Sequence, residues 1–137
     1  MATSDEIAQF VADWKTDSLA LKPAFMKYYG FLTQNPDLSL DFKGRPQVSY
    51  SIRAKHARQQ KRDLFTLIDV IDDEPESRWL SVCFYADLVQ DPQELGDFVP
   101  EGLLGEDALC FNLDENNPEM EEYIFERLRE AAANAAK

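Results

Sequence analysis

The sequence predicts an α+β fold: a two-layer sandwich whose antiparallel sheet of four or five strands carries N-terminal and C-terminal helices on one face. Apolar residues recur at helical spacing near both ends of the chain. Strand-like runs fill the middle, from Gln47 to Tyr85, and their connections are too short for crossover helices, which disfavours a parallel sheet. At 137 residues, the chain is expected to be a single domain over residues 1–137.

Two helices are expected before the sheet. An apolar stripe from Ile7 to Trp14 predicts a helix over residues 4–15. Pro23 suits the first turn of a second helix, because proline lacks the amide that such a position leaves unused. This second helix is predicted over residues 23–33.

The predicted sheet begins with a hairpin and continues with three further strands. Leu38 to Phe42 and Gln47 to Lys55 alternate between apolar and polar residues, as strands with one buried face do. Two runs, Leu64 to Ile71 and Trp79 to Tyr85, have apolar residues at both odd and even positions. This pattern is typical of strands buried on both faces. Ala108 to Leu113 is the last predicted strand.

The remaining segments are a long connection and a C-terminal helix. Residues 86–107 are expected to be irregular apart from one helical turn capped by Asp91. Asn117 and Pro118 form a cap and a first turn that predict the start of a helix. The alanine-rich end from Ala131 to Lys137 has little to bury, so it is expected to fray.

The formal net charge is −12, and it is unevenly distributed. Up to Ile68 there are ten Lys and Arg against seven Asp and Glu; from Asp69 onward there are four against nineteen. This acidity makes nucleic acid an unlikely partner. No apolar run is long enough for a membrane helix and no signal sequence is recognisable, which predicts a cytoplasmic protein with no membrane contact.

The two cysteines, Cys83 and Cys110, lie in apolar strand-like runs and are expected to be buried free thiols. With one histidine and no Cys-x-x-Cys pair, no zinc site is predicted. No glycine-rich phosphate loop is present, and no cofactor is predicted.

A basic run is the first candidate site, for an anion or a protein partner. Five of the fourteen Lys and Arg residues fall within ten positions, and such side chains form charge-assisted hydrogen bonds to carboxylate or phosphate. The alternative is a solvated connector between strands, with His56 an exposed loop residue. The run predicts a homodimer or an acidic protein partner and consists of Arg53, Lys55, His56, Arg58, Lys61 and Arg62.

Asp69 is the second candidate, because it interrupts an apolar run and must be paired, hydrated or at an edge. In a pocket with Tyr50 or Tyr85 it would be a general acid or base; an ion pair with Arg53 is the alternative. The acidic turn Asp72 to Glu76 could hold a hard cation or simply be a polar turn.

The segments Tyr28-Tyr29, Val48 to Ser51 and Asp63 to Thr66 resemble small uncharacterised bacterial domains with a helix–sheet–helix layout, some described as iron-chaperone-like. The resemblance covers about half the chain and implies no site residues. The split charge and the lack of a recognisable catalytic set favour a non-enzymatic cytosolic binding or protein-interaction domain. The alternatives are a small-ligand binder or enzyme using Asp69 with tyrosines, and an acidic metal chaperone.

The basic run and the acidic turn occupy successive connections of the predicted sheet. Successive connections in an antiparallel sheet emerge at opposite ends, so the sequence predicts a domain whose charge is polarised along the strands.

Overall fold

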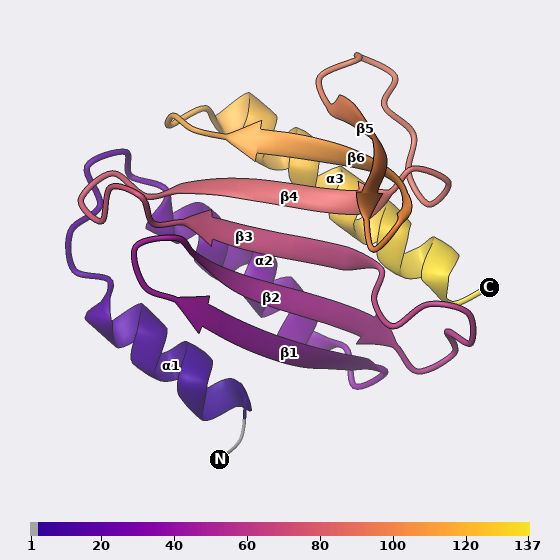
Figure 1. The fold of residues 1–137 in the computed structure, drawn as a ribbon, viewed down its shortest axis with the longest axis horizontal. Coiled ribbons are helices and arrows are strands. Elements are labelled where there is room, and N and C mark those ends of the chain that lie inside the picture. Colours follow the sequence, from indigo (N-terminus) through magenta and orange to yellow (C-terminus); the bar gives the residue numbers. More distant parts are fainter. Residues whose placement is uncertain (1–2) are drawn as a thin grey trace.

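The computed structural model describes residues 3–137 and places three helices and six strands along the chain (Figure 1). In chain order the elements are α1 (Thr3–Asp13), α2 (Lys22–Gln34), β1 (Leu38–Arg45), β2 (Ser49–His56), β3 (Thr66–Ile71), β4 (Trp79–Tyr85), β5 (Asp97–Leu103), β6 (Glu106–Leu113) and α3 (Pro118–Ala135). The α+β class and the helices at both ends confirm the predicted architecture. No helix among residues 3–137 is long and apolar enough to cross a bilayer.

All strands pair antiparallel in one sheet, in the order β1-β2-β3-β4-β6-β5. The prediction of four or five strands was wrong because β5 lies in the segment expected to be irregular. The residues of β5 before Leu103 are all exposed, so apolar and polar residues do not alternate along this part of the sequence. Pro100 and a register shift between Val99 and Leu103 are tolerated because β5 is an edge strand.

The helices bury one face of the sheet. Alternate residues of the central strands, such as Ile52, Ile68 and Val82, join a single core with residues of all three helices. In Figure 1, α2 and α3 lie behind the sheet, and α1 lies along the β1 edge. The opposite face therefore carries no helix.

The predicted opposition of the two charged connections is confirmed. Because β2, β3 and β4 are consecutive antiparallel neighbours, residues 57–65 and 72–78 emerge at opposite ends of the sheet (Figure 1). The charge itself is less polarised than expected. Asp87 and Glu106 lie at the basic end and neutralise Arg62 there.

Helix α3 begins as predicted: Asn117 Oδ1 accepts a hydrogen bond from the Met120 amide at 3.1 Å. The expectation that its alanine-rich end has little to bury was wrong. Ala131, Ala132 and Ala135 belong to the core, because small side chains allow the helix to pack closely on the sheet.

A second, smaller apolar cluster covers one end of the helix-free face. Leu64 from the β2–β3 connection, Tyr85 at the end of β4 and Leu103 and Ala108 from the β5–β6 hairpin are all buried together. The hairpin and the connection therefore form a wall at one end of that face.

Candidate functional site

The helix-free face of the sheet is the candidate site, and we call it the open face. It consists of the side chains of β1–β4 and β6 that point away from the helices. Residues paired across an antiparallel ladder point to the same side, so the register places a polar row across five strands. That row consists of Lys43, Ser51, Asp69, Ser81 and Asn112.

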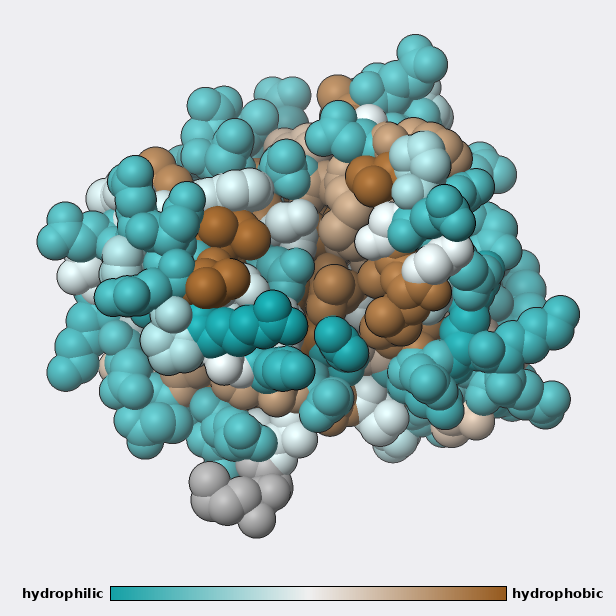
Figure 2. All heavy atoms as spheres, viewed as in Figure 1, coloured by the Kyte–Doolittle hydropathy of each residue, from teal (hydrophilic) through white to brown (hydrophobic). Residues whose placement is uncertain are grey.

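Apolar side chains flank the polar row on both sides. Ile71 and Trp79 are register partners on one side, where Trp79 also packs against the edge of the main core, and Leu67 lies on the other; all three are half-buried. Leu104, in the β5–β6 turn, is 61% exposed and faces Arg53 across a hollow of about 390 Å³. Figure 2, which views this side of the molecule, shows brown patches around a central hollow.

Strands β1 and β2 add four cations to the open face. Within residues 3–137, Lys43, Arg45 and Arg53 form no ion pair. Lys55 Nζ lies 3.9 Å from Asp63 Oδ1, a carboxylate whose side chain is 95% exposed, so this contact is weak. The cations are therefore available to an external carboxylate.

Asp69 lies in the middle of the polar row and accepts a hydrogen bond from the Ser51 hydroxyl. Burial raises the pKa of its carboxyl above the ordinary value, while the Ser51 hydrogen bond and the charges of Arg53 and Arg45 act in the opposite direction. No ion pair joins Asp69 to Arg53 among the described residues, so the arginine acts on the carboxylate through space.

The structure does not bring Asp69 together with the two tyrosines. Tyr50 has the opposite parity in β2 and stacks on Phe10 of α1, with ring centroids 4.4 Å apart. Tyr85 is buried in the smaller cluster, under the guanidinium of Arg62. The structure therefore does not form the predicted pocket of Asp69 with tyrosines: the sheet separates Asp69 from Tyr50, and Tyr85 lies at the far end of β4 in the smaller cluster.

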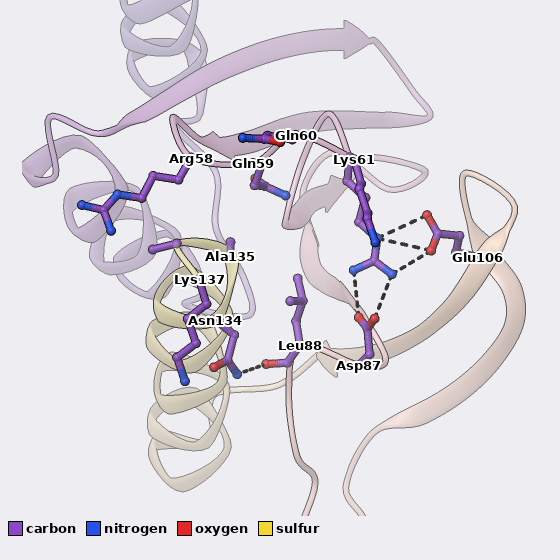
Figure 3. Close-up of a pocket in the computed structure, with 12 residues that line it drawn as sticks. Arg58, Gln59, Gln60, Lys61, Asp87, Leu88, Glu106, Asn134, Ala135 and Lys137 are labelled. Carbon is purple, nitrogen blue, oxygen red and sulfur yellow. Dashed lines mark hydrogen bonds and ion pairs between the residues drawn. The ribbon is translucent and has the colours of Figure 1, made fainter.

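The basic run is divided among three places. Arg53 and Lys55 lie on the open face, and Arg58, Lys61 and Arg62 line a cleft of about 870 Å³ beside the end of α3 (Figure 3). His56, expected to be exposed, is the last residue of β2 and only 5% exposed. His56 lies at an alternate position of β2 that faces the helices, as Ile52 does. Its Nδ1 accepts a hydrogen bond from the backbone amide of Arg58.

Arg62 is fully engaged within the protein. Its guanidinium pairs with Asp87 at 2.8 Å and Glu106 at 2.7 Å, and it lies 4.0 Å from the Tyr85 ring centroid. Figure 3 labels both carboxylates and marks their interactions with dashed lines. The hydrogen bond from Arg62 lowers the pKa of Asp87. Arg62 therefore fastens the β2–β3 connection to the β5–β6 hairpin, while the exposed Arg58 and Lys61 are left at the rim of the cleft.

The acidic turn is partly structural. Asp72 is buried, and its Oδ1 lies 2.6 Å from Arg78 Nε while its Oδ2 accepts the Gln47 amide at 2.7 Å. Asp73, Glu74 and Glu76 are exposed. Over residues 3–137, no group of three or more His, Cys, Asp or Glu side chains is arranged to hold a metal ion.

The two cysteines form a disulfide, so the prediction of free thiols was wrong. Cys83 in β4 and Cys110 in β6 are directly opposed in the register, with Cα atoms 4.0 Å apart. Both side chains lie on the open face and are half-buried. The sequence could not show this contact because residues 86–105 separate the two strands.

Sequence reasoning missed the polar row and half of the cations. Lys43 and Arg45 fall between the two predicted strands of the hairpin, after Phe42 and before Gln47, although β1 continues to Arg45. The polar parity of Gln47 to Lys55 was a usable signal, since it already marked a face that no helix covers. No family model, no curated protein and no solved structure compared with the chain gives a match, so geometry alone supports a function.

Proposed function

We propose that this chain is a protein-binding domain whose open face docks an acidic partner protein. The single observation that carries the proposal is the presence, on one uncovered surface, of half-buried apolar side chains beside cations that have no ion-pair partner among residues 3–137. Leu67, Ile71 and Trp79 supply the apolar part. Lys43, Arg45 and Arg53 supply the charge.

The chemistry of the face selects an acidic protein over other occupants. Apolar and aromatic side chains at the centre of a patch contribute most of the binding free energy in protein interfaces. The cations at its edge steer a carboxylate-rich surface and repel a basic one. Nucleic acid is disfavoured because the whole chain carries a net charge of −12 and Asp41 and Asp69 lie among the cations.

A second copy of this chain is the competing occupant. The chain is acidic overall, so another copy also offers carboxylates to the open face. The wall formed by the β5–β6 hairpin stands at one end of the face and hinders flat packing of two sheets against each other. The proposal therefore commits to a different, acidic protein, and the cytoplasmic location remains a prediction that fractionation would check.

The proposal is tested with a labelled random copolymer of glutamate and tyrosine, followed by fluorescence anisotropy. A copolymer of lysine and tyrosine is the reference of opposite charge. The doubly reversed variant Arg45→Glu/Arg53→Glu should weaken binding of the acidic copolymer at least about tenfold, which corresponds to about 1.4 kcal/mol. Lys15→Glu/Lys137→Glu reverses two exposed cations away from the open face and should leave binding unchanged. Trp79→Ser should also weaken binding.

The outcomes are distinct. Equal loss in the Lys15/Lys137 variant would mean non-specific charge attraction and would overturn the proposal, as would the absence of binding. Sedimentation velocity of the unliganded protein gives the second arm. A dimer that Arg45→Glu/Arg53→Glu dissociates would assign the open face to a second copy instead of an acidic partner.

A further inference from the structure

The disulfide occupies an accessible place in the sheet. Cys83 and Cys110 lie side by side on the open face, where β4 and β6 are neighbours (Figure 1). Both are half-buried, and none of the three helices covers them. Cys110 packs against the smaller apolar cluster, and the partial exposure of both residues lets a thiol reagent approach the pair from the open face.

The fold does not need the bond to keep these two strands together. The β4–β6 ladder continues from Leu80–Leu113 to Tyr85–Ala108, and it has Phe84 and Phe111 in the core on its other face. After reduction, the same ladder would hold the two thiols opposite each other. Reformation of the bond would then be an intramolecular step favoured by proximity.

The two sulfur atoms have different surroundings. Exposed Asp97 of β5 is the register partner of Cys110, so its carboxylate disfavours negative charge on that sulfur. Cys83 has Leu67 as its register partner, and the Ser81 hydroxyl lies 3.8 Å from its Sγ. Cys83 is therefore the better leaving thiolate when an external thiol attacks the bond.

We propose that Cys83 and Cys110 are a redox-active pair that undergoes thiol–disulfide exchange with a dithiol in the folded protein. The dithiol's thiolate attacks Cys110 Sγ, the Cys83–Cys110 bond breaks, and Cys83 leaves as a thiolate that takes up a proton. The second thiol of the reagent then attacks the reagent's first sulfur, which is bonded to Cys110 in the mixed disulfide. Cys110 leaves as a thiolate and is also protonated. The cystine gains two electrons and two protons, and the dithiol is oxidised to a disulfide.

The test uses the wild-type protein in native buffer, first with reduced dithiothreitol and then, after its removal, with reduced and oxidised glutathione at a series of ratios. Free thiols are counted by mass after alkylation, and far-UV circular dichroism follows the fold. We expect reduction by dithiothreitol within minutes, complete reoxidation by excess oxidised glutathione, and an unchanged spectrum in both states. Cys83→Ser and Cys110→Ser are then exposed to oxidised glutathione; each should take up one glutathione, whereas the oxidised wild type should take up none.

Three results would overturn the proposal. The first is a bond that dithiothreitol reduces only in denaturant, which would make it a structural disulfide. The second is loss of the native spectrum on reduction, and the third is a native protein in which oxidised glutathione cannot restore the bond between the two thiols. The double variant Cys83→Ser/Cys110→Ser controls for effects of the reagents on the rest of the chain, and its spectrum and stability should not depend on the redox ratio.

Discussion

Replacing Arg78 with methionine should destabilise the fold by about 3–5 kcal/mol, because the Asp72 carboxylate would be left buried without its counter-ion. The Asp72 side chain is 3% exposed and that of Arg78 is 11% exposed, and their charged atoms lie 2.6 Å apart. The guanidinium also lies 5.4 Å from the ring centroids of Phe10 and Tyr50, which joins α1 to the β2 strand. Methionine keeps a long apolar stem against those rings but loses the cation.

A double-mutant cycle separates the ion pair from its surroundings. Asp72→Leu alone leaves Arg78 buried and removes the acceptor of the Gln47 amide, so it should cost at least as much as Arg78→Met. In Asp72→Leu/Arg78→Met no charge is left unpaired, and the main remaining penalty is the Gln47 amide, about 1–3 kcal/mol. The double variant should therefore be more stable than either single variant.

The assay is equilibrium unfolding in urea, followed by circular dichroism and tryptophan fluorescence. Arg129→Met is the matched control, because Arg129 pairs with Glu126 on the surface of α3 with more than half of its side chain exposed. That substitution should cost less than about 1 kcal/mol. If Arg78→Met cost no more than Arg129→Met, the burial argument for the Asp72–Arg78 pair would be refuted.

Three further predictions use the same unfolding assay. Asp69→Asn should stabilise the protein at pH 7, because burial raises the carboxyl's pKa in the folded state and so penalises its charged form. The gain should vanish as the pH falls below the ordinary value of 3.8, where both states are protonated; a gain that persists there would contradict the reasoning. Gln47→Gly should stabilise by up to about 1 kcal/mol, since Gln47 has a φ of 71°, and Gln47→Ala should not. Asn117→Ala should cost about 1 kcal/mol through the lost cap of α3, whereas Asn117→Ser should cost much less.

Much of the fold could be predicted because its periodic segments are long and uninterrupted. The Trp79–Tyr85 strand and the start of α3 at Pro118 were predicted at the observed positions. Strand β5 could not be predicted, because its pairing with β6 is irregular and its exposed side chains have no period-two pattern. The buried alanines of α3 show a related limit, since alanine packs closely against a core yet gives a weak hydrophobic signal.

For the candidate site, some of its residues could be predicted from the sequence, but their arrangement in space could not. The sequence identified the cations Arg53 and Lys55 and the unusual Asp69, and the structure places all three on the open face. It could not show that the sheet separates Asp69 from Tyr50, because which residues of two paired strands share a face depends on their register. The same dependence hid the contact between Cys83 and Cys110, which the register of β4 and β6 creates.

The sheet order also determines how the chain can fold. Strands β1 to β4 form a meander in which every pairing joins sequence neighbours, and β5 and β6 form a separate hairpin. Only the β4–β6 pairing has a strand, β5, between its members along the chain. Mixed α/β chains dominated by such local pairings fold faster than sandwiches of similar length. Among the strand pairings, docking of the β5–β6 hairpin on β4 closes the longest loop and therefore has the largest loop-closure entropy cost, and this step brings Cys110 and Asn112 onto the open face.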